Sequence, residues 1–145
     1  MTYLSAHFTL EEMVTSETAT RYGIDNTPND DTVDNLRFLS STLEEVRILL
    51  DKPLLIKSGY RCPKLNSAIG GSKTSQHMLG LAADFICPQF GTPFDVVSEI
   101  ARSTLIFDQL IYEGSWVHIS ITEAPRHEIL TARFNPTRYE KGINK

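Results

Sequence analysis

The spacing of apolar residues in the first third of the chain predicts one long helix. Apolar side chains recur every three or four residues from position 33 to position 50, at Val33, Leu36, Leu39, Leu43, Val46 and Leu50. This period buries one face of a helix and leaves the other face to water. The preceding Thr27-Pro28-Asn29-Asp30 offers a cap, a proline for the first turn and an acidic residue at the positive helix end.

A shorter helix is predicted to begin at Thr9. Thr9 and Glu12 have the three-residue spacing of a capping box, in which each side chain bonds the backbone N–H of the other residue. Residues 25 to 28 interrupt the helical pattern. The N-terminal part, about residues 8 to 50, is therefore expected to be helical.

After residue 53 the pattern changes to short apolar runs that end at glycine or proline. Such runs predict strands over residues 54–58, stopped by Gly59, and over residues 82–87, stopped by Pro88. Between and after them the pattern predicts a helical turn over 63–69, a loop at 70–72 and a helix over 93–102 with proline at its start.

The last third of the chain predicts a β-hairpin. Residues 108–113 and 116–121 are β-rich and are separated only by Gly114-Ser115, a two-residue loop with glycine first, as a type II′ turn prefers. The predicted class is α+β, with a largely antiparallel central sheet packed against the long amphipathic helix. No repeat, low-complexity tract or linker divides the chain, so residues 1–145 are expected to form a single domain.

The hairpin also predicts which side chains share a face. If Glu113 and Trp116 flank the turn, then Glu113, Ile111, Trp116, His118 and Ser120 all project to one side of the sheet. Glu113 is then the diagonal neighbour of His118, with Cβ atoms roughly 7 Å apart.

Composition and charge exclude several classes of protein. The 145 residues are 41% hydrophobic and 22% charged, enough for a core without disulfides. No apolar stretch approaches the roughly 20 residues that a membrane span needs. A net charge of −4 and a pI near 5.5 leave no basic stripe for nucleic acid. Cys62 and Cys87 are expected to be free thiols.

The N-terminal residues do not have the basic region and apolar run of a secretory signal peptide. We therefore expect the protein to be made in a cytoplasm.

Two imidazoles and one carboxylate are the candidate chemistry. His77 and Asp84 lie in the segment Ser75-Gln76-His77-Met78-Leu79-Gly80-Leu81-Ala82-Ala83-Asp84, and His118 follows far downstream. This mixed nitrogen and oxygen set suits a divalent metal such as zinc with one coordination position left open, as a hydrolase needs. A carboxylate at Glu113 could take the proton of a water on that metal, which points to hydrolysis of an amide bond.

Three motifs resemble a known family. Ser-Gly-Tyr-Arg at 58–61, Ser75-x-His77 with Gly80 and Ala83-Asp84, and Trp116-Val117-His118 are similar to the zinc D-alanyl-D-alanine carboxypeptidases, peptidase family M15, including small phage-encoded members. The similarity spans residues 54 to 121, the expected zinc-site core. Segments 8–12 and 25–28 also resemble small members. The resemblance implies a hedgehog-like zinc fold with the site on one face of the sheet.

Carried over residue by residue, the resemblance implies that His77, Asp84 and His118 bind one zinc ion. It implies that Arg61 steadies the substrate carbonyl and the oxyanion formed from it, and that Ser75 helps to hold the substrate. Ser75 is equally suited to forming a local turn.

The chain departs from the family at the catalytic base. Many members have an acidic residue three positions before the last histidine, and here that position is Ser115. The related hedgehog domain has a Tyr-Glu pair shortly before its final histidine, so Tyr112-Glu113 is the preferred choice. Glu123 is the alternative base.

The function that the resemblance implies is cleavage of a peptide bond in bacterial peptidoglycan, by a D,D-carboxypeptidase or an endopeptidase. We expect a monomeric, endolysin-like enzyme of a bacteriophage, which reaches the wall through a membrane pore or belongs to a virion. Because position 115 has no carboxylate, a zinc-stabilised binding or virion structural module with little catalysis is the alternative. The bond cut and the host stay open.

Overall fold

The computed structural model describes all 145 residues. Its elements follow in the order α1 (Leu10–Val14), α2 (Glu17–Tyr22), α3 (Asp30–Leu50), β1 (Leu55–Ser58), α4 (Pro63–Ala68), the 3₁₀ helix η1 (Gln76–Leu79), β2 (Ala82–Ile86), α5 (Pro93–Arg102), β3 (Gln109–Tyr112), β4 (Val117–Ser120), β5 (Glu128–Arg133) and β6 (Arg138–Lys141). The predicted α+β class is confirmed. No helix is both long and apolar enough to cross a membrane.

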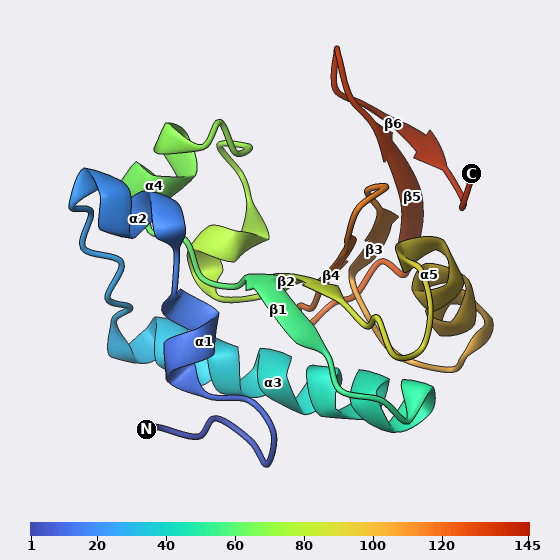
Figure 1. The fold of residues 1–145 in the computed structure, drawn as a ribbon, viewed down its shortest axis with the longest axis horizontal. Helices are drawn as coiled ribbons and strands as arrows, with labels where there is room; N and C mark the ends of the chain where they lie inside the picture. Colours follow the sequence, from blue (N-terminus) through green and yellow to red (C-terminus); the bar gives the residue numbers. More distant parts are fainter.

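The six strands form one sheet in the order β1-β2-β4-β3-β5-β6. Every neighbouring pair is antiparallel except β3 and β5, which run parallel. The mostly antiparallel sheet is therefore as predicted. In Figure 1 helices α1, α2 and α4 lie on one side of the molecule, β3 to β6 lie on the other, and α3 runs along the bottom.

The N-cap of the long helix α3 lies two residues after the predicted cap, Thr27. Asn29 is the N-cap, and its side chain accepts a hydrogen bond of 2.8 Å from the backbone N–H of Thr32. Pro28 therefore precedes the helix, and the prediction that it lies in the first turn was wrong. An amide side chain at Asn29 can accept this bond, whereas proline has no side-chain acceptor.

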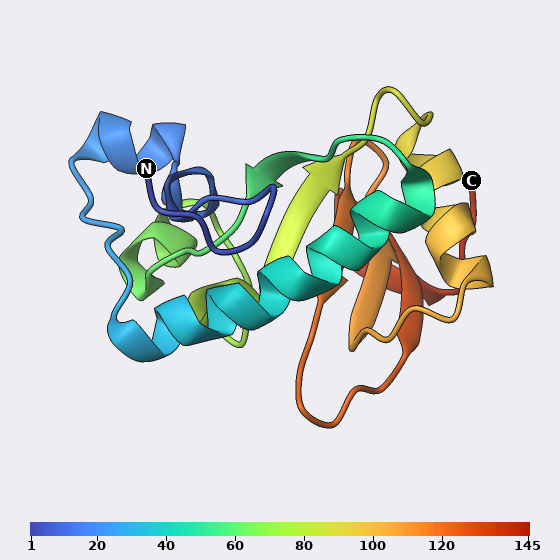
Figure 2. The ribbon, with the colours of Figure 1, turned by 90° about the horizontal axis from the view of Figure 1, so that it is seen from below.

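Figure 2 shows α3 lying across one face of the sheet. Leu36, Leu39 and Leu43 are fully buried and join residues of β2 and β4 in one hydrophobic core. The helix is only partly amphipathic. Its buried positions also include Thr32, Ser40 and Thr42, and its exposed positions include Phe38 and Ile48.

The starts of the shorter helices α1 and α5 are fixed by hydrogen bonds between residues close in sequence. Thr9 and Glu12 form the predicted capping box, with bonds of 3.2 Å and 2.8 Å. Helix α5 spans 93–102, as predicted, and its N-cap Thr92 pairs with Asp95 in the same way. Helix α2 was not predicted as a separate element, although Ser16 caps it.

The β3–β4 hairpin has the predicted register with a tighter turn. Ile111 lies opposite His118, and the N–H of Glu113 donates to the carbonyl of Trp116 at 3.1 Å. Gly114 has φ of +80°, and the N–H of Ser115 donates to the carbonyl of Glu113 at 3.0 Å. This three-residue bond is that of a γ-turn, in place of the predicted type II′ turn.

Strands β5 and β6 were not predicted. Their hairpin projects from the sheet beside β3, in red at the C-terminal end of Figure 1. It joins the sheet through parallel pairing of β5 with β3, a non-local contact that no short sequence pattern announces.

A buried aspartate fixes the start of β5. Asp108, whose side chain is 2% exposed, accepts hydrogen bonds from the backbone N–H, Nε and Nη2 of Arg126 at 3.0, 2.9 and 2.7 Å. It also accepts one from Nε2 of Gln76 at 3.0 Å. The hydrogen bonds from Arg126 outweigh the effect of burial and lower the pKa of Asp108 to about 2, from an ordinary value of 3.8.

We expect Asp108→Asn to destabilise the protein by about 2 kcal/mol at pH 7, because a carboxyl with a lowered pKa stabilises the fold wherever it is ionised. This contribution is present above the unfolded pKa and is lost as pH falls through the folded pKa. The difference in free energy of unfolding between wild type and variant should therefore disappear between about pH 4 and pH 2. Urea unfolding across this range measures it.

Asp34→Asn is the control, because Asp34 is an exposed aspartate on α3. It should change the free energy of unfolding by less than about 0.5 kcal/mol. A difference in free energy of unfolding between wild type and Asp108→Asn that does not depend on pH would contradict the stabilising role of the ionised Asp108.

Candidate metal centre

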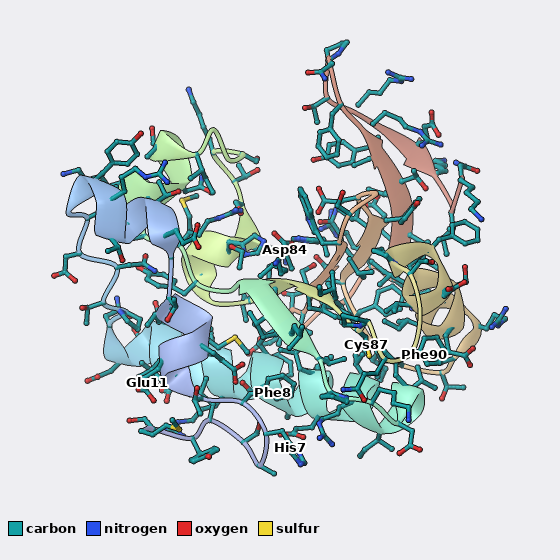
Figure 3. The ribbon with its side chains drawn as sticks, viewed as in Figure 1. His7, Phe8, Glu11, Asp84, Cys87 and Phe90 are labelled. Carbon is teal, nitrogen blue, oxygen red and sulfur yellow. The ribbon has the colours of Figure 1, made fainter.

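Three side chains from three elements converge near the middle of the molecule. His77 lies on η1, Asp84 on β2 and His118 on β4, and one ligand atom of each lies within 4.8 Å of the others. Asp84 and His118 are direct partners across the antiparallel β2–β4 pair. Figure 3 shows Asp84 near the centre, between α1, α2 and α4 on one side and strands β3 to β6 on the other. The structure thus brings together the three predicted ligands.

The backbone around His77 holds its ring in one orientation. Ser75 caps η1 and accepts a bond of 3.2 Å from the N–H of His77, and Gly80 ends the helix with φ of +74°. The buried ring donates from Nδ1 to the carbonyl of Gly59 at 2.7 Å. This bond selects the tautomer in which Nε2 carries a lone pair. Nε2 faces Oδ1 of Asp84 at 3.3 Å.

His118 faces the same carboxylate with Nδ1, whereas His77 faces it with Nε2. Nδ1 of His118 lies 2.9 Å from Oδ1 of Asp84, and the centroids of the two imidazole rings are 5.1 Å apart. Two ring nitrogens and one carboxylate oxygen form the donor set of a zinc site that keeps a position for substrate or water. The residues present therefore fit a zinc ion.

The charges at the site are coupled. Burial alone would raise the pKa of Asp84, but the neighbouring His77 and His118 hold it well below its usual range. Burial lowers the pKa of His77, only partly offset by Asp84, and so favours the neutral imidazole that binds metals. For His118 the hydrogen bond and charge of Asp84 outweigh burial and raise the pKa.

Glu113 lies on the same face of the sheet, as the hairpin predicted. Its Oε2 is 3.9 Å from Nδ1 of His118 and accepts a hydrogen bond of 3.1 Å from Nε1 of Trp116. Burial, and then the charge of Asp84, raise the pKa of Glu113. The alternative base, Glu123, lies elsewhere, in a separate groove beside α3.

Arg61 approaches the site from the loop after β1. Its Nη2 donates to Oγ of Ser75 at 3.3 Å, and its backbone N–H donates to the carbonyl of His77 at 3.1 Å. Nε of Arg61 is buried without a hydrogen-bond partner. Burial lowers the pKa of Arg61, and the nearby Asp84 and Glu113 partly restore it.

A cleft with a volume of about 510 Å³ contains all the predicted site residues. One side is lined by Arg61 and the loop over residues 69–76, and the floor by the three candidate ligands with Glu113. The other side includes Leu130, Phe134, Thr137 and Tyr139 of the β5–β6 hairpin, which the sequence did not implicate.

A family model for peptidase M15 matches residues 6–120. The chain belongs to the peptidase M15 family. Membership implies a zinc-dependent metallopeptidase, and the group of His77, Asp84 and His118 could hold the metal. A search of curated proteins returns no match.

The remaining histidines and both cysteines do not line the cleft of this M15 site. Nδ1 of His7 is 2.7 Å from a carboxylate oxygen of Glu44, at the edge of the molecule in Figure 3. His127 is exposed and stacks on Phe107. Both cysteines are free, as predicted.

Two residues support the site through contacts that the sequence did not reveal. Asn26 is buried, and its side chain donates to the carbonyls of Val14 and Tyr60 and accepts from the N–H of Cys62, at 2.8 to 3.0 Å. These bonds attach the loop that carries Arg61 to the N-terminal helices. The one signal for Asn26 was its place in a segment resembling small M15 members.

Gly59 is the second supporting residue. A Cβ at Gly59 would lie 2.4 Å from the backbone oxygen of Met13, closer than real side chains approach. Only glycine therefore lets α1 pack against the end of β1. The same residue supplies the carbonyl that orients His77.

We predict that Gly59→Ala weakens zinc binding by about tenfold or more, because the backbone must shift and carry with it the carbonyl that orients His77. Zinc affinity, measured by competition with a chromophoric chelator, tests this.

Gly70→Ala is the matched control. Gly70 has φ of +73° but open space around its Cβ position, and its backbone N–H donates to the carbonyl of Ser67 at the end of α4. It should cost about 1 kcal/mol of stability from backbone strain and leave zinc affinity unchanged. Equal zinc affinities for the two variants would refute the role of Gly59.

Proposed function

We propose that the protein is a zinc peptidase that hydrolyses peptide bonds in bacterial peptidoglycan, next to a D-amino acid. The observation that carries the proposal is convergence in one cleft: three ligand atoms within 4.8 Å of one another, with Glu113 beside them and Arg61 at the rim. Membership of the M15 family supports the reaction class.

In this proposal Nε2 of His77, Oδ1 of Asp84 and Nδ1 of His118 hold one zinc ion. Zinc bound by such a set polarises a carbonyl and makes water acidic enough to be deprotonated near neutral pH.

Glu113 is the proposed general base. Nε1 of Trp116 donates a hydrogen bond of 3.1 Å to Oε2 of Glu113 and so holds the carboxylate in place. Oε1 of Glu113 has no hydrogen-bond partner in the chain. Oε1 can then take a proton from the attacking water and return it to the leaving amine. Partial burial raises the pKa of this carboxyl, which makes it a stronger base than an exposed glutamate.

Arg61 is the proposed stabiliser of the oxyanion. A guanidinium keeps its charge when buried and donates in a fixed plane. Its place supports this role, because Arg61 lines the cleft beside the candidate ligands and lies within range of the charges of Asp84 and Glu113. Ser75 orients the guanidinium through its bond to Nη2 and contributes to substrate binding.

The proposal takes residues 1–145 as one peptidase domain that acts as a monomer, without nucleic acid as a partner. Its setting is a bacteriophage endolysin or virion enzyme, made in the host cytoplasm and delivered to the cell wall.

The first test is zinc content by mass spectrometry beside peptide release from purified peptidoglycan. The wild-type protein should carry one zinc ion per chain. His77→Ala should lose both the zinc and the activity, because two ligands hold zinc much less tightly than three. Full activity after complete chelation of the metal would contradict the proposal.

The second test separates the enzyme from a zinc-stabilised binding module. Glu113→Gln should keep one zinc ion per chain and lower kcat by about a hundredfold or more, since the amide cannot accept the proton. The control is Glu123→Gln, the carboxylate outside the cleft, which should retain wild-type kcat. If zinc-loaded wild-type protein binds peptidoglycan peptides and hydrolyses none, the protein is the binding module.

A further inference from the structure

The β5–β6 hairpin forms a wall of the cleft and lies outside the segment that matches the M15 family. The match ends at residue 120, and the hairpin begins at Glu128. Family membership therefore assigns no role to this wall. Its side chains reach the same cleft as the candidate metal ligands.

Strand register shows how the wall is placed relative to the site. Ile111 of β3 lies opposite both His118 of β4 and Leu130 of β5, so these three share one row across the sheet. The pairing of β3 with β5 ends at Tyr112 and Thr131. Continuing this register by one residue places Glu113 beside Ala132, whose partner on β6 is Tyr139. Tyr139 thus occupies the row of the proposed base on the same face. Only the small Ala132 stands between them.

Aromatic side chains are exposed along this wall. Phe134 and Tyr139 are 47% and 56% exposed, and the ring of Phe134 is 6.4 Å from that of Trp116 at the cleft floor. Rings grouped beside a polar cleft provide apolar area for a ligand that has both apolar and polar groups.

The hydroxyl of Tyr139 is available as a donor. It forms no hydrogen bond with another group of the chain, although the residue lines the cleft. Partial burial and the charges of Glu113 and Asp84 raise the pKa of the phenol, which keeps it protonated. Arg61 lines the same cleft, so a peptide bound there can contact both a guanidinium and a phenol.

The wall is held by bonds of its own. Thr131 of β5 donates to the carbonyl of Gly142 at 2.7 Å and accepts from the N–H of Asn144 at 2.9 Å. These contacts tie the chain after β6 back onto β5. Tyr139 is therefore presented by a paired strand, which gives a defined position for binding.

We propose that Tyr139 is a substrate-binding residue of this peptidase, whose ring packs on the apolar part of a cell-wall peptide and whose hydroxyl donates a hydrogen bond to a carbonyl or carboxylate oxygen of the same peptide. This inference rests on the proposed function, because it names a residue for the same substrate class.

Binding to a synthetic cell-wall pentapeptide ending in D-Ala-D-Ala tests it without turnover. All variants are made in the zinc-loaded Glu113→Gln background, and Kd is measured by calorimetry. Trp116, the single tryptophan, gives a second reading through its emission, because it lines the same cleft. Tyr139→Phe removes the hydroxyl alone and should weaken binding about fivefold, as the loss of one hydrogen bond predicts.

Tyr139→Ala removes the ring as well and should weaken binding more than about tenfold. Tyr22→Phe and Tyr22→Ala are matched controls, because Tyr22 is 64% exposed on α2 and lies outside the cleft. They should leave Kd unchanged. In the active enzyme, which has Glu113, Tyr139→Phe should raise KM by the same factor and leave kcat unchanged, because the hydrogen bond from the hydroxyl contributes only to substrate binding.

The outcomes distinguish this inference from the proposed function. If the wild-type protein hydrolyses the pentapeptide, and both Tyr139 variants bind and cleave it like the Tyr22 controls, the role of Tyr139 is overturned while the peptidase stands. If the pentapeptide binds in a Tyr139-dependent way, and the wild type neither cleaves it nor releases peptides from purified peptidoglycan, the peptidase assignment fails and the binding residue stands. If neither calorimetry nor Trp116 emission detects binding in the Glu113→Gln background, the inference is overturned.

Discussion

The hydrogen bond from Nδ1 of His77 to the carbonyl of Gly59 links the metal site to the rest of the fold. A histidine can bind a metal with either ring nitrogen, and this 2.7 Å bond leaves Nε2 free to face Asp84. The carbonyl is held because Gly59 fits against the backbone of Met13, where no other residue has room. Helix α1 therefore shapes the site without contributing a side chain to it.

The sheet supplies the second part of the arrangement. Antiparallel pairing of β2 with β4 sets Asp84 opposite His118, and the tight β3–β4 turn sets Glu113 on the same face. Alternation along each strand sends the neighbouring residues, such as Phe85 and Ile119, into the core beneath α3. One register thus divides the sheet into an apolar face for stability and a polar face for chemistry.

Charge balance at the polar face favours a bound cation. Asp84 and Glu113 place two carboxylates in a partly buried space, and the charge of Asp84 contributes to the raised pKa of Glu113. Arg61 offsets part of this charge from the rim, at the expense of a buried Nε without a partner. A divalent ion between the two histidines and Asp84 would lessen the repulsion and leave Glu113 in place as a base.

Local patterns in the sequence determined much of this protein. Helix α5, the capping box of α1, the burial of Leu36 and Leu43 and the register that pairs Ile111 with His118 follow from side-chain period and turn chemistry, which act over a few residues. The motifs also predicted the candidate ligands. Tertiary structure alone decided the rest. Asn26, Gly59 and Tyr139 reach the site through contacts between segments far apart in the chain, and parallel pairing of β5 with β3 builds the wall. Such contacts depend on shape and packing in three dimensions, so no short stretch of sequence encodes them.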